Sequence, residues 1–347
     1  MTHVEVFVGP AHDLVHTSLL LTGLCSLAAR GQITVRYRRA RGSAAWLSGD
    51  PMVVVLDLHD QQKTRVAIDL RDGEGISQPI IDRVDAYFKR AFYTLECDRF
   101  PQYSAKMIPF GFNYGCRSAR STARLLATTG GAIALAGREG LNRLKHYLLT
   151  PGPDVFELAP EMPVEPLVAF QTRLWLPEEV GWAGESEELN AERVAMVRAL
   201  KKSFGSRFVG GLVPTPFARE HYGDDLTPHS SKYAEYLRIK KRCLVSVYTR
   251  GVEHSLAFKL GETFAASQCL VSVPLRYSLP VPIEVGRNYL EFDGVEACLA
   301  ACERLLADPA LARSMRHANH DYYRREIEPA AKMTRVMERV AAWRRES

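Results

Sequence analysis

Three polar residues at helical spacing in an otherwise apolar segment are the first candidates for chemistry in this sequence. Residues 251–275 read GVEHSLAFKLGETFAASQCLVSVPL, which predicts a helix followed by a short strand. At about 100° per residue, Ser255, Lys259 and Glu262 point in nearly the same direction on that helix. A carboxylate can accept hydrogen bonds from hydroxyl groups, and a lysine can attract an anion. The stripe therefore either lines a binding site or simply faces water.

A second group of candidates follows the first predicted strand, VEVFVG. The next residues, PAHD, place His12 and Asp13 beyond the carboxyl end of that strand, where open α/β sheets bind ligands. Either side chain could take a proton from a hydroxyl group. The alternatives are a loop histidine and an aspartate that caps the following helix. Asp69, Asp72 and Glu74, in IDLRDGEG, end another predicted strand and form a further acid–base candidate.

The elements that must position these residues alternate between strand and helix twice along the chain. VEVFVG, QITVRYRR, MVVVLDL and TRVAIDL are strand candidates in the first series, and PLVAFQTRLW, SRFVGGLV, CLVSVYT and CLVSVPL in the second. Between the series, residues 150–166 carry five prolines and read as a linker. The pattern predicts two α/β domains with mostly parallel sheets, at 1–155 and 156–328, and a final helix at 329–347.

Composition narrows the class of protein. The 347 residues carry a formal net charge of +5, which is below the clustered basicity of a dedicated nucleic-acid binder. The seven cysteines are scattered without a C-x-x-C pair, which favours free thiols in a reducing compartment. No signal peptide and no apolar run of about 18 residues is visible, so we expect a cytoplasmic protein. Peripheral contact with a membrane stays open.

Several catalytic motifs are missing from the sequence. There is no G-x-G-x-x-G after the first strand and no G-x-x-x-x-G-K-[ST], which argues against a dinucleotide oxidoreductase and a P-loop enzyme. H-E-x-x-H and G-x-S-x-G are absent as well. There is also no D-x-D pair, so we expect no resident metal and no cofactor.

The order of motifs resembles that of glycosyltransferases with the GT-B architecture, in particular the "glycosyl transferases group 1" set of bacterial polysaccharide loci. FVGGLVP, GVEHSLAFKLGETFAASQCLVSVPL and LLADPALARSM are similar to the C-terminal half of such enzymes, and RVAIDLRDGEG and IPFGFNYGC to the N-terminal half. The resemblance covers most of the chain. It implies two Rossmann-like domains that face each other across a cleft, with the last helix, after Pro329, crossing back to the first domain.

The resemblance also implies roles for the polar stripe. Glu262 occupies the place of a glutamate that hydrogen-bonds the ribose hydroxyls of the nucleotide. Eight residues upstream, where many relatives carry another glutamate, this chain has His254. Residues 251–255, from Gly251 to Ser255, would form the helix N-terminus and offer backbone N–H groups to a diphosphate. Lys259, one turn before Glu262, would add positive charge.

Arg173 follows the first strand of the second domain, where resembling enzymes place a basic residue against the diphosphate. A guanidinium there would support departure of the leaving group without a metal. The alternative for Arg173 is a surface salt bridge.

Together these observations predict a metal-independent transferase that moves a sugar from a nucleotide-sugar donor to a hydroxyl of a glycan or lipid-linked acceptor. The donor would bind the second domain. An inverting reaction would use His12, Asp13 or Asp72 as its base, whereas a retaining enzyme would need none. Two alternatives remain: a sugar-nucleotide 2-epimerase, and a non-catalytic protein that binds a nucleotide or a nucleic acid through RYRRAR or RIKKR. No nucleic-acid partner is expected.

Overall fold

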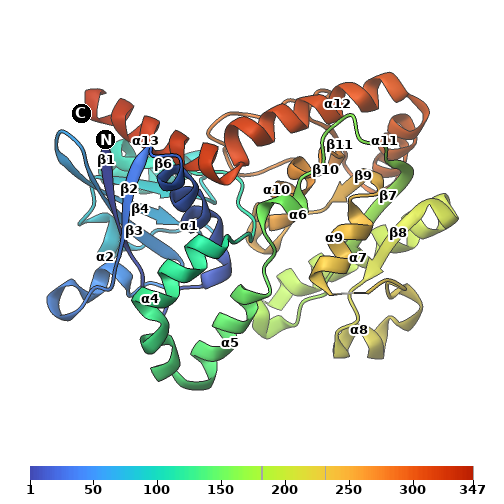
Figure 1. Ribbon diagram of the computed structural model, residues 1–347. Coiled ribbons are helices and arrows are strands. Elements are labelled where there is room, and N and C mark those ends of the chain that lie inside the picture. The colour runs from blue at the N-terminus through green and yellow to red at the C-terminus, as the bar shows by residue number, and fades with distance from the viewer. Residues whose placement is uncertain (181–182, 231, 347) are drawn as a thin grey trace. The chain divides into compact units, whose positions relative to one another are not determined.

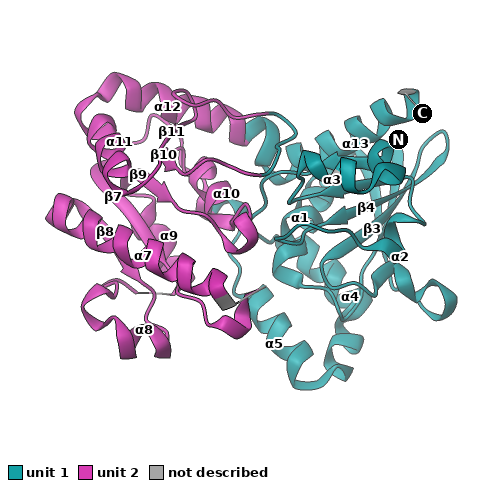
Figure 2. Ribbon diagram, turned by 180° about the vertical axis from the view of Figure 1, so that it is seen from behind, with its two compact units in different colours: residues 1–154, 277–281, 324–347 teal, residues 155–276, 282–323 magenta. Residues whose placement is uncertain are grey.

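The computed structural model describes residues 1–180, 183–230 and 232–346, and the chain forms two compact units (Figure 1). Unit 1 contains Met1–Asp154, Tyr277–Val281 and Arg324–Ser347, and unit 2 contains Val155–Arg276 and Pro282–Tyr323 (Figure 2). The last helix, α13 (Pro329–Glu346), therefore belongs with the N-terminal unit. The short return of 277–281 to unit 1 has no counterpart in the sequence prediction.

Unit 1 is built on a six-stranded mixed sheet with the order β2-β1-β3-β4-β5-β6. The strands are β1 (Thr2–Phe7), β2 (Ile33–Arg38), β3 (Val53–His59), β4 (Lys63–Asp69), β5 (Ala86–Lys89) and β6 (Met107–Pro109). Only β3 runs antiparallel to its neighbours. Three residues join β3 to β4, which suffices for a hairpin but not for a parallel crossover.

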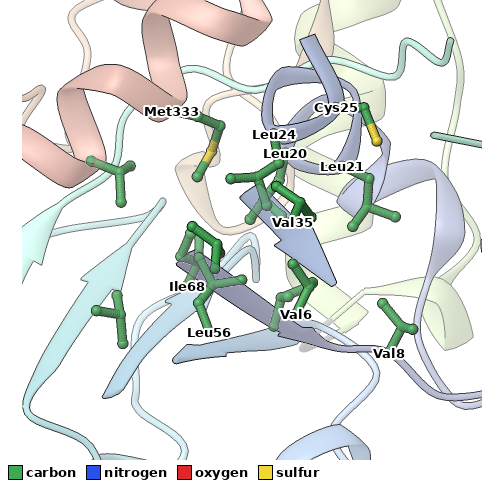
Figure 3. Close-up of a cluster of buried hydrophobic side chains, with 14 of the residues drawn as sticks. Val6, Val8, Leu20, Leu21, Leu24, Cys25, Val35, Leu56, Ile68 and Met333 are labelled. Atoms are coloured by element: carbon green, nitrogen blue, oxygen red, sulfur yellow. The ribbon is translucent and has the colours of Figure 1, made fainter. Parts of the chain in front are cut away.

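Helices complete unit 1. They are α1 (Leu14–Ala29), α2 (Gln78–Ile81), α3 (Thr94–Arg99), α4 (Ala119–Leu135), α5 (Gly137–Leu148) and α13. Leu20 and Leu24 of α1 and Met333 of α13 pack on Leu56 and Ile68 of the sheet (Figure 3). The two helices approach so closely that a Cβ on Gly23 would lie 2.0 Å from the carbonyl oxygen of Pro329.

Unit 2 is built on a five-stranded, fully parallel sheet with the order β11-β10-β9-β7-β8. The strands are β7 (Glu165–Thr172), β8 (Phe208–Leu212), β9 (Cys243–Tyr248), β10 (Cys269–Ser272) and β11 (Tyr289–Glu291). From β7 the chain goes first to β8 on one side and then to β9 on the other. The topological switch point therefore lies between β7 and β9, where such sheets bind ligands.

The helices of unit 2 alternate with these strands. They are α6 (Pro153–Phe156), which starts at the end of unit 1, α7 (Ala183–Phe204), α8 (Pro216–His221), α9 (Tyr233–Lys240), α10 (Phe258–Ala265), α11 (Val295–Ala307) and α12 (Pro309–Tyr322). The core is apolar and includes Val197 of α7, Val245 of β9 and Leu305 of α11. Two α/β units with largely parallel sheets confirm the predicted fold class.

The seven cysteines are all free, and six of them are buried, as their scattered positions predict. None of the helices in the described part of the chain is both long enough and apolar enough to cross a bilayer.

Candidate functional site

A cavity of about 770 Å³ opens at the carboxyl ends of three adjacent strands of unit 2. Thr249, Val273 and Phe292 line it, and they directly follow β9, β10 and β11. The middle of α7 and the first residue of α11 complete the wall. The volume lies within the range of small-molecule sites, and parallel α/β sheets bind ligands at this edge.

The cavity combines an apolar lining with a few charged side chains. Met196, Val273 and Phe292 contribute apolar surface, whereas Arg250 and Arg276 contribute positive charge. Glu192, Asp293 and His254 also line it. An apolar wall with a small number of charged groups suits a ligand that has a flat or apolar part and an anionic part.

Arg250 is held by carboxylates of α7. Its guanidinium lies 3.0 Å from Glu188 and 3.1 Å from Glu192, and Glu185 lies 4.0 Å away. These three glutamates share one face of α7 because they are three and four residues apart. With 14 % of its side chain exposed, Arg250 fastens the loop after β9 to the helix.

That loop contains two consecutive residues in the left-handed region. Glu253 has φ 53° and His254 φ 59°, a conformation that costs a non-glycine residue about 1–3 kcal/mol. The backbone N–H of Glu253 donates to Glu185, whose other carboxylate oxygen is buried without a hydrogen-bond partner. Gly251 is needed for close approach, since a Cβ there would lie 2.4 Å from Oγ of Ser255.

His254 stands at the wall of the cavity as a result of this loop geometry. Its side chain lines the cavity, and its backbone N–H donates to the carbonyl of Gly251 at 3.1 Å. Partial burial lowers the pKa of His254, and the positive charges of Arg250 and Arg276 lower it further. The strained turn therefore presents a histidine that favours its neutral form.

Arg193 closes the crevice at the switch point between β7 and β9. It donates to the carbonyl oxygen of Arg173 at 2.6 Å and to that of Arg250 at 3.1 Å, and so bridges the ends of the two strands. Burial lowers the pKa of Arg193 to about 10. Because Arg193 fills the crevice between β7 and β9, the cavity lies next to it, at the ends of β9, β10 and β11.

The structure corrects the predicted start of the helix in 251–275. Helix α10 begins at Phe258, so residues 251–255 form a turn and not a helix N-terminus. The left-handed Glu253 and His254 are incompatible with a right-handed helix. The expected helix N-terminus at 251–255 is therefore wrong, and a role of Gly251 and Ser255 toward a diphosphate remains a prediction.

The polar stripe does not line the large cavity. Ser255 is 4 % exposed and Glu262 is 3 % exposed. Glu262 accepts a hydrogen bond from the hydroxyl of Tyr233 at 2.6 Å and pairs with Lys240 at 3.4 Å. Lys240 is itself 4 % exposed, so the two charges form a buried ion pair. Ribose binding by Glu262 remains a prediction that would require these partners to move.

Lys259 is likewise occupied within unit 2. Its ammonium donates to the carbonyl oxygen of Gln171 on β7, beside a void of about 20 Å³. Burial and the nearby charges of Arg193 and Lys240 lower its pKa to about 7. Lys259 thus connects α10 to the sheet, and a contact between Lys259 and a phosphate remains a prediction.

Arg173 forms the surface salt bridge that was its alternative interpretation. It pairs with Glu179, and its guanidinium lies 4.3 Å from the ring centre of Trp175. The side chain is 44 % exposed, and a role toward a diphosphate remains a prediction.

In unit 1 the structure argues against His12 as a base. The side chain is 2 % exposed, and both ring nitrogens are engaged: Nδ1 accepts from the N–H of Gly9 at 3.1 Å, and Nε2 lies 3.1 Å from the carbonyl oxygen of Val53. Burial lowers the pKa of His12 to about 4. A ring fixed in this way has no nitrogen left for a substrate hydroxyl, so the predicted catalytic role is corrected to a structural one.

Asp13 is the N-cap of α1, its alternative interpretation. Its carboxylate accepts from the backbone N–H groups of Val15 at 3.0 Å and His16 at 2.9 Å. Burial raises its pKa, but the side chain of His16 and these N–H groups outweigh burial and lower the pKa to about 2. Asp13 is therefore a poor proton acceptor at neutral pH.

His16 is a residue that the sequence interpretation missed. Its Nδ1 lies 3.1 Å from Oδ1 of Asp13, and its side chain is 24 % exposed in the first turn of α1. A carboxylate beside one ring nitrogen orients an imidazole for proton transfer at the other. The signal was present in the sequence, because His16 follows Asp13 by three residues.

Asp72, the third predicted base, is 46 % exposed and lies 2.6 Å from the guanidinium of buried Arg90. Arg90 also donates to the carbonyl of Leu70 at 3.1 Å, so the pair closes the loop after β4. A proton-transfer role for Asp72 remains a prediction.

One group among the described residues has metal-ligand types close together: Glu5, Asp57 and His59 in unit 1. Both carboxylates are already neutralised, Glu5 by Arg38 at 2.7 Å and Asp57 by Arg65 at 2.7 Å. This cluster is best described as an ion-pair network on the sheet.

The cavity residues Arg250, Arg276 and Asp293 were also missed by the sequence interpretation. Arg250 and Arg276 follow β9 and β10, two of the predicted strands, by no more than four residues, so a strict application of the strand-end rule would have selected them. Asp293 follows β11 by two residues. Nothing in the sequence indicated that Glu188 and Glu192 would lie at a site, since acidic residues near the start of a helix are usually explained by their favourable interaction with the helix dipole.

No protein-family model matches the chain, and no curated protein matches its sequence. Solved structures do match. The C-terminal domain of a glycosyl transferase group 1 family protein (LpcC) from Francisella tularensis is 12% identical, with 50% of this chain and 96% of that chain covered and a TM-score of 0.35. The likeness is one of fold.

Two further solved structures match over nearly the whole chain. A putative UDP-N-acetylglucosamine 2-epimerase from Listeria monocytogenes is 11% identical, with 99% and 97% of the chains covered and a TM-score of 0.43. A glycosyltransferase from Rickettsia africae is 10% identical, with 96% and 82% covered and a TM-score of 0.43. At these identities the matches describe a likeness of fold alone.

Proposed function

We propose that the chain is a glycosyltransferase that moves a sugar from a nucleotide-sugar donor to a hydroxyl of a glycan or lipid-linked acceptor. The observation that carries the proposal is the cavity at the carboxyl ends of β9, β10 and β11. Its apolar wall suits a nucleoside, and Arg276 suits the charge of a diphosphate, whereas Arg250 would have to exchange its contacts with Glu188 and Glu192 to take part. In this assignment His254 binds the donor from the strained turn after β9.

The acceptor and its base belong to unit 1 in this proposal. His16 replaces His12 and Asp13 as the leading base, because its Nδ1 lies 3.1 Å from a carboxylate oxygen of Asp13 and its side chain is partly exposed. Deprotonation of the acceptor hydroxyl by a positioned imidazole accounts for about 10²–10⁴-fold of a rate enhancement. Asp13 would then act as a positioning residue that orients His16.

Binding of donor to unit 2 is tested by filling the cavity. Ala195 of α7 lines the cavity, and Ala195→Phe would occupy space that a ligand needs. We expect isothermal titration with uridine diphosphate and other nucleoside diphosphates to show at least about a tenfold loss of affinity, which corresponds to about 1.4 kcal/mol. Lys202→Phe, at an exposed position of the same helix, is the control and should bind as wild type. Equal loss in both variants, or no loss in Ala195→Phe, would remove the assignment.

The base is tested by His16→Gln. We expect turnover to fall by roughly 10²-fold while nucleotide affinity stays the same, as for a lost proton-transfer group. His59→Gln, in the same unit but at the end of antiparallel β3, serves as the matched control. Release of free nucleotide only in the presence of acceptor supports transfer, whereas a donor sugar epimerised without acceptor would show the 2-epimerase activity instead.

A further inference from the structure

Helices α4 and α5 of unit 1 form a hairpin with an unusual surface (Figure 1). Five of the eleven large apolar side chains that are exposed among the described residues belong to this short part of the chain. They are Leu126 (37 %), Leu135 (87 %), Leu141 (53 %), Leu148 (40 %) and Leu149 (67 %). Such a concentration on one element indicates a surface that something covers.

The outward face of α4 is apolar over most of its length. Leu125, Thr129 and Ile133 are buried toward the core. From residue 123 to the end of the helix, the exposed positions are Ala123, Leu126, Ala127, Gly131, Ala134 and Leu135. A surface helix normally places polar residues on its exposed side. From Ala123 to the end of α4 none of the exposed positions carries a charge or a hydrogen-bonding side chain, and the exposed Arg120 lies in the first turn of the helix.

The tip of the hairpin is tightly built. Gly137 has φ 68°, which allows the sharp turn between the helices. A Cβ on Gly140 would lie 2.3 Å from the carbonyl oxygen of Ile133, so α5 passes directly against the end of α4. The exposed Leu135 and Leu141 flank this turn, and the close packing holds them at a fixed end of the hairpin.

Positive charge surrounds the apolar face. Residues 117–149 contain six Arg and Lys residues and a single acid, Glu139, so their formal net charge of +5 equals that of the whole chain. Arg120, Arg138 and Lys145 are exposed. Arg124 and Arg143 donate to the carbonyls of Val35 and Pro10 and so connect the hairpin to the sheet edge and the loop after β1.

We propose that the α4–α5 hairpin docks on an anionic lipid surface, with Leu135 and Leu141 among the acyl chains and Arg138 and Lys145 at the phosphate groups. An apolar face beside lysine and arginine is the pattern of helices that lie in a membrane interface. A second copy of the chain fits less well, because two hairpins face to face would bring like charges together. The inference does not depend on the proposed transferase activity, and none of these residues lines the cavity of unit 2.

The test is co-sedimentation of the full-length protein with vesicles of phosphatidylcholine alone and of phosphatidylcholine mixed with phosphatidylglycerol. We expect binding to the mixed vesicles only, weakened by salt because the charges are screened. The double variants Leu135→Ser with Leu141→Ser, and Arg138→Glu with Lys145→Glu, should each lower the partition coefficient at least about tenfold. Leu95→Ser removes a leucine that is 52 % exposed on α3 of the same unit, and should bind as wild type.

Two results would overturn the proposal. One is wild-type protein that stays in the supernatant with anionic vesicles, or double variants that bind them as wild type does. The other is a wild-type dimer in gel filtration with light scattering that Leu135→Ser with Leu141→Ser converts to a monomer, which would assign the face to a second copy. Thermal melting of each variant confirms that the exposed substitutions leave the fold intact.

Discussion

Replacing Glu262 by glutamine separates the structural role of this residue from the ribose-binding role that its sequence motif predicts. Glu262 and Lys240 are 3 % and 4 % exposed, and their charged atoms lie 3.4 Å apart. Removing one charge from a buried pair leaves the other without compensation, which costs about 3–5 kcal/mol. The hydroxyl of Tyr233 can still donate to a glutamine oxygen, so the lost stability comes mainly from Lys240, which no longer has a charged partner.

The magnitude follows from the state of Lys240. Burial already lowers the pKa of Lys240, and Glu262 is the partner that opposes this effect. In Glu262→Gln the lysine must lose its proton or remain charged in an apolar environment. We expect the melting temperature of unit 2 to fall by roughly 10 °C in differential scanning calorimetry. The double variant Lys240→Met with Glu262→Gln should recover most of that loss, because it buries no unpaired charge.

The control is an ion pair on α9, the helix that carries Lys240. Glu235 and Arg238 of α9 pair at 2.6 Å but are exposed, so Glu235→Gln should leave the melting temperature unchanged within error. The reasoning is refuted if Glu262→Gln melts as wild type and loses affinity for uridine diphosphate, because Glu262 would then be a ribose ligand and not half of a structural pair. A double variant that is no more stable than Glu262→Gln would also contradict it.

Three further predictions can be checked in the same preparations. Burial lowers the pKa of Lys332 from its ordinary 10.5 to about 7, so between these pH values the unfolded state binds more protons and the free energy of unfolding should rise by up to about 1.4 kcal/mol per pH unit. When the free energy of unfolding is measured by urea titration at several pH values, its slope against pH should be smaller by this amount in Lys332→Met. Equal slopes in wild type and variant would contradict the assignment. Asp13→Ala removes the N-cap of α1 and should cost about 1 kcal/mol of unfolding free energy, whereas Asp13→Asn should cost less; equal losses would show that capping is not the cause. Turnover, measured as nucleotide release, should stay within about a factor of two after treatment with chelator, since Arg276 supplies positive charge at the cavity in place of a metal. A large loss of turnover that magnesium or manganese restores would refute this.

The alternation of strands and helices was predictable because each element depends on the local spacing of its apolar residues. Runs such as VVVLDL and CLVSVY are apolar on both faces, as buried strands of α/β sheets are, and they became β3 and β9. The position of His12 and Asp13 beyond the end of β1 followed from the same rule. Their roles did not, because the capping bonds of Asp13 and the backbone partners of His12 depend on contacts that the rule does not contain.

The break between Gly251 and Phe258 could not be predicted from the sequence. No proline or glycine interrupts residues 252–260, and the spacing of Ser255, Lys259 and Glu262 is consistent with one continuous helix. The turn is imposed from outside: Glu185 of α7 accepts the N–H of Glu253, and Tyr248 donates to the carbonyl of Ser255 at 2.6 Å. Tertiary contacts of this kind outweigh helix propensities of a few tenths of a kcal/mol per residue.

The sequence by itself determined two α/β domains, their strands and a set of charged residues at strand ends. Only the tertiary structure decided which of those residues face a cavity and which are buried as partners of one another. Glu262 and Lys240 are 22 residues apart and look like independent surface charges in the sequence, yet packing of α10 against α9 makes them a buried pair. In the sequence Glu192 looks like one of several solvated charges on a helix. In the structure the face of α7 that carries it packs against the loop after β9, so Glu192 contacts Arg250 and lines the cavity. Burial is a property of the packed chain, and it sets both the charge cost and the accessibility that separate a ligand group from a structural one.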